Sequence, residues 1–149
     1  MDETYSFNGA CTDCYNGDGD VHATLVLEDY TPGDSIEASN FVSFSYSGSN
    51  LVPAFTVLPA NLTLGISGVI PTTLPGPAEV HIFFDLPTSN FISNTDGSWY
   101  VNEADYGTSG TWSAAPEPST WALTLIGFAG LAYASARHAK TMRSAGSAG

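Results

Sequence analysis

Residues 21–27 read VHATLVL, and this stretch decides the class of fold. Apolar side chains recur at every second position, at Val21, Ala23, Leu25 and Leu27, while His22, Thr24 and Val26 fill the positions between them. A period of two is typical of a β-strand that buries one face. The stretch therefore predicts a half-buried strand with His22 on its outer face.

Segments of the same kind lie on both sides of this strand. We expect further strands at residues 4–7, 41–47, 51–57, 61–67, 79–84, 91–92, 99–101 and 110–113. The side chains expected to point inward are Tyr5, Phe7, Val42, Phe44, Tyr46, Leu62, Leu64, Ile66, Val80, Ile82 and Phe84. Pro53 cannot donate to a sheet ladder, so the strand that contains it is expected at an edge or a bulge.

Turn sequences separate these strands at Asn8-Gly9, at residues 31–34 and at Asp96-Gly97. Short strands with turns at intervals of roughly 8 to 12 residues are typical of an antiparallel sandwich. We therefore predict an all-β domain over residues 1–115, an antiparallel β-sandwich of jelly-roll or Ig-like type.

The charges divide the chain into two parts. The formal net charge is −12; all fifteen Asp and Glu residues lie at or before Glu117, and all three Lys and Arg residues lie after it. Nucleic acid is excluded as a partner of the first part, because binding it requires Lys and Arg to replace counterions. Divalent cations, basic proteins and neutral polysaccharide remain open as partners.

Residues 116–149 have a different character, reading PEPSTWALTLIGFAGLAYASARHAKTMRSAGSAG. Pro116, Glu117 and Pro118 resist helix formation. The uncharged run that follows predicts a transmembrane helix at about 120–136, of roughly 24 Å, which can cross a thin membrane of less than the usual ~30 Å. Trp121 and Arg137 mark its interfacial flanks, and Lys140 and Arg143 continue a basic tail over 137–149 that is expected in the cytoplasm.

This segment resembles the PEP-CTERM sorting signal of Gram-negative bacteria, a type of segment also described as an ice-binding-protein C-terminal domain. The resemblance covers PEPSTWALTLIGFAGLAYA and implies recognition by an exosortase, a membrane protease-transpeptidase that cuts near the motif. Pro116, Glu117 and Pro118 would be the recognition element. The alternatives are a plain membrane anchor and a buried core helix.

The resemblance implies export, yet the first residues, MDETYSFNGA, have neither a basic nor an apolar region of a secretory signal. We expect that the natural start lies upstream of Met1. The end of the sandwich region, DGSWYVNEADYGTSGTWSA, also resembles a small β domain that recurs in PEP-CTERM proteins, for which no activity is implied.

Cys11 and Cys14 are the only cysteines. Outside the cytoplasm they are expected to form a local disulfide. A thioredoxin-like pair is disfavoured, because acidic neighbours raise a thiol pKa, and a zinc site lacks ligands beyond His22.

Oxygen-bearing side chains follow at Asp13, Asn16, Asp18 and Asp20, separated by glycines. Such a run can surround Ca²⁺, although an EF-hand register would require a carboxylate where Leu25 stands. The open choices are a weak Ca²⁺ site and a solvated polar turn, and no other cofactor is expected.

No catalytic motif is present in the sequence. The carboxylates Glu28, Glu37, Glu79, Glu103 and Asp105 offer no pair that the sequence singles out, and His22 and His81 are expected on outer faces. The aromatic residues Trp99, Tyr100, Tyr106 and Trp112 can stack on sugar rings or pack in the core.

These observations predict a non-enzymatic protein that is exported, anchored in the inner membrane, processed by an exosortase and placed at the cell surface or in an extracellular polysaccharide matrix. The alternative is a carbohydrate-, calcium- or ice-binding module. A hydrolase lacks a recognisable site.

Overall fold

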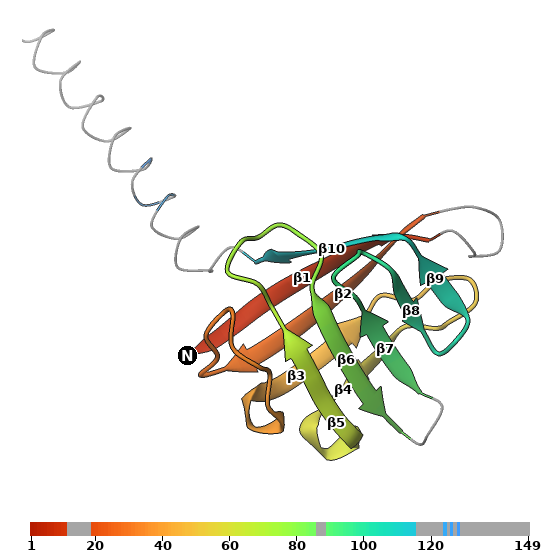
Figure 1. Cartoon of the computed structure of the whole chain (residues 1–149), viewed down its shortest axis with the longest axis horizontal. Helices are drawn as coiled ribbons and strands as arrows, with labels where there is room; N and C mark the ends of the chain where they lie inside the picture. The colour runs from red at the N-terminus through yellow and green to blue at the C-terminus, as the bar shows by residue number, and fades with distance from the viewer. Residues whose placement is uncertain (12–18, 86–88, 116–123, 125, 127, 129–149) are drawn as a thin grey trace, which may run out of the picture. The chain divides into compact units, whose positions relative to one another are not determined.

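The computed structural model describes residues 1–11, 19–85, 89–115, 124, 126 and 128 (Figure 1). The chain divides into two compact units, Met1–Ala115 and Pro116–Gly149. The first unit is all-β. Its elements in chain order are β1 (Asp2–Ala10), β2 (Asp20–Glu28), β3 (Phe41–Tyr46), β4 (Phe55–Val57), β5 (Leu62–Val69), β6 (Glu79–Phe84), β7 (Asn90–Ser93), β8 (Trp99–Val101), β9 (Asp105–Gly107) and β10 (Ser109–Ala114), with single 3-10 turns at Ala38–Asn40 and Pro59–Asn61.

The strands form two five-stranded antiparallel sheets. Sheet A has the order β10-β1-β2-β3-β4 and sheet B the order β5-β6-β7-β8-β9. Within each sheet the neighbouring strands are consecutive in the chain, except that β10 returns from the end of sheet B to pair with β1. The prediction of an all-β domain is confirmed. The up-and-down strand order differs from the Greek-key order of jelly-roll and Ig-like sandwiches, so neither of these two predicted topologies is seen.

Aromatic rings from both sheets meet in one core. Phe91 of sheet B lies with its ring centroid 5.2 Å from Phe7 and 4.7 Å from Phe44, both of sheet A. Phe55 and Phe84 make a second contact of this kind, at 4.6 Å. The sheets therefore pack face to face, an arrangement compatible with the predicted sandwich.

The period-two pattern places the core residues correctly in several strands. Val21, Ala23, Leu25 and Leu27 of β2 are all buried, as are Tyr5 and Phe7 of β1 and Val80, Ile82 and Phe84 of β6. The predicted turn at Asp96-Gly97 is also confirmed, since the amide of Gly97 donates to the carbonyl of Asn94 at 3.0 Å. Pro53 precedes β4, which is an edge strand as expected.

The predicted turn at Asn8-Gly9 is wrong. Both residues lie inside β1, where Gly9 pairs with Val21 on one side and Gly110 on the other. The glycine is required by packing, because a Cβ there would lie 2.7 Å from the Trp99 ring. A glycine inside a strand often marks the close approach of another group, so Asn8-Gly9 reads as a turn although Gly9 makes room for the Trp99 ring.

Two inward assignments are wrong because of register shifts. At the start of β3 Phe41 is buried and Val42 is only half-buried, since the pairing with β2 slips between Val26 and Leu27. In β5 the pairing slips between Leu62 and Gly65, and Leu64 is 72% exposed. A bulge moves the next side chain to the other face, so a strict alternation overlooks it.

Gly65 and Gly68 provide a matched pair for measuring how tightly β5 is packed. Both have positive φ, +92° and +130°, so alanine is strained at either position. A Cβ at Gly68 would lie 2.0 Å from the carbonyl oxygen of Glu79, whereas a Cβ at Gly65 has nothing within 4 Å. We expect Gly65→Ala to lower the free energy of unfolding by about 1–2 kcal/mol, and Gly68→Ala by about 1–3 kcal/mol more.

Urea unfolding of the full chain and its two variants measures this difference. Equal losses for Gly65→Ala and Gly68→Ala would contradict the close contact between β5 and β6.

Candidate functional site

The residues predicted to direct sorting lie outside the described part of the chain: Pro116, Glu117, Pro118, Trp121, Arg137, Lys140 and Arg143. Within the predicted membrane helix at about 120–136, Thr124, Ile126 and Phe128 are described, and they are helical and exposed. Over the residues that the structure describes, there is no helix with the length and apolar character needed to span a membrane. The sorting helix therefore stays a prediction.

The region between β1 and β2 is described at its two ends. Cys11 is disulfide-bonded, and Cys14, the only other cysteine of the chain, lies outside the described residues, so their pairing stays a prediction. The Cys11 Sγ lies 3.6 Å from the carbonyl oxygen of Tyr106, which places this end of β1 against β9.

The predicted calcium ligands are only partly described. Asp20 is exposed at the start of β2, while Asp13, Asn16 and Asp18 lie outside the described residues. Among residues 1–11, 19–85 and 89–115, no group of three His, Cys, Asp or Glu side chains is placed to hold a metal ion.

One of the five candidate carboxylates is buried between the sheets. Asp105 of β9 is 0% exposed and accepts hydrogen bonds from the Tyr46 hydroxyl at 2.6 Å and the Ser49 hydroxyl at 2.8 Å. Tyr46 belongs to β3 and Ser49 follows it, so the carboxylate connects sheet B to sheet A. The other four, Glu28, Glu37, Glu79 and Glu103, are exposed and do not form a pair with Asp105.

The Asp105 cluster is internally satisfied. The Ser49 hydroxyl oxygen also accepts from the backbone amides of Leu51 and Val52, at 3.0 Å each, which orders the loop before β4. Burial, then the hydrogen bond and charge of Asp105, raise the pKa of the Tyr46 hydroxyl above its ordinary value of 10.0. A carboxylate held by two hydroxyls in the core joins the sheets, and this geometry points to a structural role.

Two of the four aromatic candidates are core residues. Trp99 and Trp112 are fully buried, and both rings contact Phe7. Trp112 donates from Nε1 to the Ser93 hydroxyl at 3.0 Å, and that hydroxyl donates to the Ala78 carbonyl at 2.8 Å. Neither tryptophan can stack on an external ligand.

The other two aromatic candidates face outward from sheet B. Tyr100 and Tyr106 lie directly opposite each other on β8 and β9. Their neighbours Trp99, Val101, Asp105 and Gly107 are buried, so the tyrosines occupy the opposite face, and Tyr106 is 43% exposed. The cross-strand register extends this pair across the whole sheet as one row, which we call the outer row of sheet B: Tyr106, Tyr100, Ile92, His81 and Ser67.

The outer face of sheet A carries hydroxyls instead of aromatic rings. Its central row, in cross-strand register, consists of Ser113, Ser6, Thr24, Ser45 and Thr56. Ser45 and Thr56 are linked through their hydroxyl oxygens at 3.3 Å. The two outer faces of the domain therefore differ in chemistry, one hydroxyl-lined and one aromatic.

The two candidate histidines, His22 and His81, lie on these two outer faces, as expected. His22 is exposed on sheet A, and its Nδ1 lies 2.5 Å from the Asn8 side-chain oxygen. His81 on sheet B is half-buried. Its Nε2 is shielded from solvent and has no hydrogen-bond partner among the described residues, with the Glu79 carboxylate 3.9 Å away.

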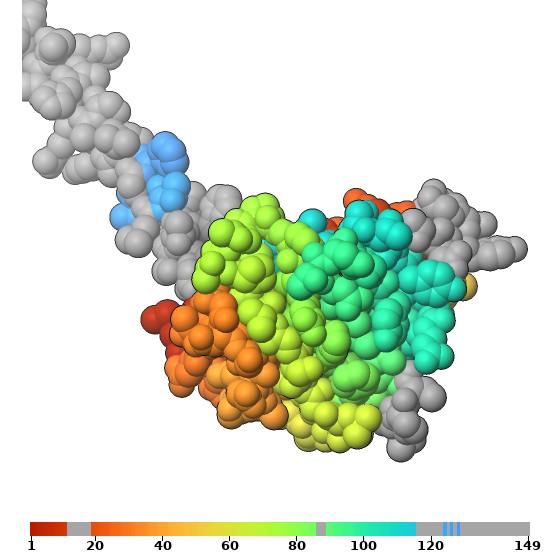
Figure 2. All heavy atoms as spheres, viewed as in Figure 1, coloured from red at the N-terminus to blue at the C-terminus, as the bar shows by residue number. Residues whose placement is uncertain are grey.

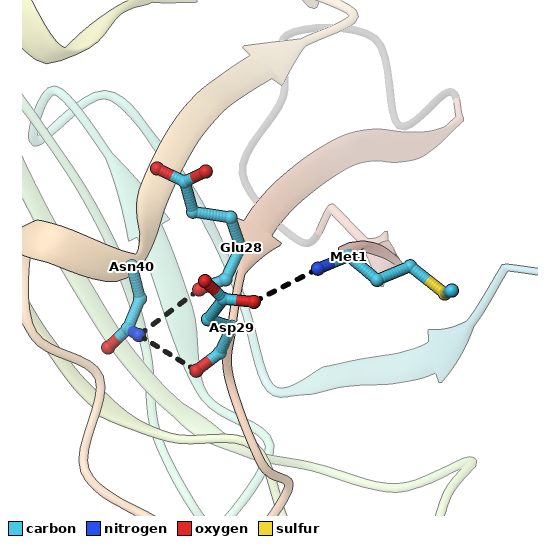
Figure 3. Close-up of polar contacts among 4 residues, drawn as sticks. All are labelled: Met1, Glu28, Asp29 and Asn40. Atoms are coloured by element: carbon cyan, nitrogen blue, oxygen red, sulfur yellow. Dashed lines mark hydrogen bonds and ion pairs between the residues drawn. The ribbon is translucent and has the colours of Figure 1, made fainter.

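The most distinct surface cluster of charge joins the start of β1 to the end of β2 (Figure 3). The Met1 amine donates to the Asp29 carboxylate at 3.0 Å, and the Asn40 amide donates to the carbonyls of Glu28 and Asp29 at 3.1 Å and 3.3 Å. Asp29 has a φ of +48°, so Asn40 supports a left-handed position. Both partners of the ion pair are exposed, and such pairs contribute little stability.

Sequence reasoning named Asp105, Tyr100 and Tyr106, but it could not assign their roles. β9 was not predicted, because two of its three residues, Asp105 and Gly107, are of types that are depleted in strands. The partnership of Asp105 with Tyr46 joins residues 59 positions apart in the sequence. No local signal indicates such a contact.

Removal of the Asp105 carboxylate is expected to destabilise the domain. In Asp105→Ala the buried Tyr46 hydroxyl and the Ser49 hydroxyl lose their acceptor, which we expect to cost about 3 kcal/mol of unfolding free energy. Tyr46→Phe removes one of these bonds and is expected to cost less. Urea unfolding of the full chain checks the order, and a loss below about 0.5 kcal/mol for Asp105→Ala would exclude the role of this bridge.

Alkaline conditions test the same core through its tyrosines. Burial raises the pKa of Tyr5, Tyr30 and Tyr46 above 10.0 in the folded protein. A raised folded-state pKa stabilises the fold at pH values below the unfolded pKa, and this contribution is lost as the pH rises above about 10. We therefore expect unfolding free energy to fall above pH 10. The tyrosinate absorbance of Tyr5, Tyr30 and Tyr46 should appear together with unfolding, and ionisation of these three side chains near pH 10 in the native state would contradict the burial.

The described residues thus provide a satisfied polar bridge inside the domain, a hydroxyl-lined outer face and an aromatic outer row. The bridge explains stability, and the two outer faces are available for contact with other molecules. Comparison with protein-family models, curated proteins and solved structures finds no match to this chain.

Proposed function

We propose that this chain is an exported, non-enzymatic surface or matrix protein in which a β-sandwich is carried by a C-terminal sorting segment. In this proposal one transmembrane helix at about 120–136 follows the sandwich. An exosortase recognises Pro116, Glu117 and Pro118. The sandwich then leaves the inner membrane for the cell surface or an extracellular polysaccharide.

The observation that supports this proposal is the place where the sandwich ends. β10 pairs with β1 up to Ala114, and the amide of Ala115 makes one further bond, to the Thr4 carbonyl at 2.8 Å. The next residue, Pro116, has no amide hydrogen to donate. The boundary between the two compact units falls at the same position. A cut after Ala115 would therefore leave the pairing of β10 intact.

The charge distribution supports a passive role for residues 1–115. They contain no Lys or Arg to stabilise an oxyanion or a phosphate, and the buried Asp105 is occupied by Tyr46 and Ser49. A surface function needs only a stable domain with suitable outer faces.

Expression of the chain behind an added secretory signal peptide, in a Gram-negative host with an exosortase, tests the proposal. We expect the wild-type chain to lose mass from its C-terminus and to leave the inner membrane, because the motif directs cleavage. The variant with Pro116, Glu117 and Pro118 replaced by alanine should keep its full mass and stay in the membrane. Intact mass spectrometry of fractionated cells measures both.

Pro53→Ala is the matched control, because Pro53 is an exposed proline of the sandwich outside the motif, and it should be processed like the wild type. Equal processing of the triple-alanine variant and the wild type would show that Pro116, Glu117 and Pro118 do not direct cleavage. If the wild type and the triple-alanine variant both stay in the membrane at full mass, residues 116–149 act only as a membrane anchor.

A further inference from the structure

We infer that the outer row of sheet B binds a neutral polysaccharide by stacking sugar rings on Tyr100 and Tyr106, with the exposed Ser67 supplying hydrogen bonds at the other end of the row. The inference rests on the proposed surface or matrix function and adds to it the ligand class and the contact surface.

The register fixes the geometry of this row. Ser67, His81, Ile92, Tyr100 and Tyr106 are successive cross-strand partners on five neighbouring strands. Neighbouring strands lie about 4.8 Å apart, so the row is about 19 Å long. A row of this length can contact several consecutive units of a linear polymer.

The two tyrosines provide the stacking surface. Residues directly opposite in an antiparallel pair have Cβ atoms about 4.5–5.5 Å apart, so the side chains of Tyr100 and Tyr106 leave sheet B at neighbouring positions on the same face. Aromatic faces carry negative partial charge and attract the C–H groups on the face of a sugar ring. The phenol hydroxyls can exchange hydrogen bonds with sugar hydroxyls.

The other end of the row is polar. His81 is half-buried there, and its Nε2 is shielded from solvent, with the Glu79 carboxylate 3.9 Å away. Ser67 is exposed beside it. A stacking surface with a few polar groups at its end is typical of small-ligand and sugar sites, because the polar groups set the orientation.

No other described strand covers this face. Figure 2 shows sheet B, coloured from yellow-green to cyan, toward the viewer with the strands of sheet A behind it. Ile92 is outward in the row and 7% exposed, and its cross-strand neighbours on the same face are Tyr100 and His81. The accessible part of the row therefore lies at its two ends.

Charge selects a neutral polymer over an acidic one. Residues 1–115 contain no Lys or Arg, while Glu79 lies next to the row and fourteen of the fifteen acidic residues lie in this part of the chain. An acidic polysaccharide would be repelled without a cation to compensate. Hydroxyl-rich, uncharged chains meet no such barrier.

Affinity electrophoresis of the full chain in detergent, through gels that contain hydroxyethylcellulose, dextran or the acidic polymer alginate, tests the inference. We expect retardation by at least one of the two neutral polymers and none by alginate. Tyr100→Ala and Tyr106→Ala should each weaken binding about tenfold, the effect of losing a central contact. Tyr106→Phe should keep most of the affinity, because it keeps the ring.

Thr24→Ala, in the hydroxyl row on the opposite face, is the matched control and should bind like the wild type. Circular dichroism confirms that each variant is folded. Wild-type protein that binds neither neutral polymer, or unchanged binding after both tyrosine substitutions, would overturn the inference. So would loss of a dimer in Tyr106→Ala during sedimentation, since the face would then bind a second copy.

The outcome is separate from the sorting experiment. A chain that is processed in the host but binds no neutral polymer contradicts only the polysaccharide surface. A chain that binds but is never processed contradicts only the sorting proposal.

Discussion

The contact of Phe7 with the aromatic rings around it holds the two sheets together. Its ring meets Phe91 of sheet B and the two buried tryptophans, Trp99 and Trp112, within 5.2 to 5.7 Å. The rings of Phe7 and Trp99 also pack directly against backbone that carries no side chain. Gly9, Gly107 and Gly110 provide that space, since a Cβ at any of them would lie within 3 Å of these rings.

The sequence predicted most of the fold because the central strands alternate strictly. β2 and β6 bury every second residue. The failures have two physical causes. Bulges at Val26 and around Leu64 shift the register without changing the composition, and Gly9 serves ring packing where the local sequence indicates a turn. The pairing of β10 with β1 brings together the two ends of the domain, and no local sequence pattern indicates a contact over that distance in the chain.

The candidate sites could be named from sequence but not distinguished. The sequence did not distinguish the four aromatic residues near the end of the domain. Alternation along the short strands buries Trp99 and Trp112 and places Tyr100 and Tyr106 on the outer face. The same holds for the carboxylates, of which only Asp105 lies inside. Which member of each set is available to a ligand follows from long-range pairing.

The pairing of β10 with β1 also determines how the domain would carry mechanical load. Six cross-strand pairs, from Tyr5 with Ala114 to Ala10 with Ser109, lie between the last strand and the rest of sheet A. A pull on Ala115 along the strand axis loads these pairs together in shear, whereas a pull across the sheet would open them one after another. A domain tethered through its C-terminal end therefore resists force best when the tether runs in line with β10.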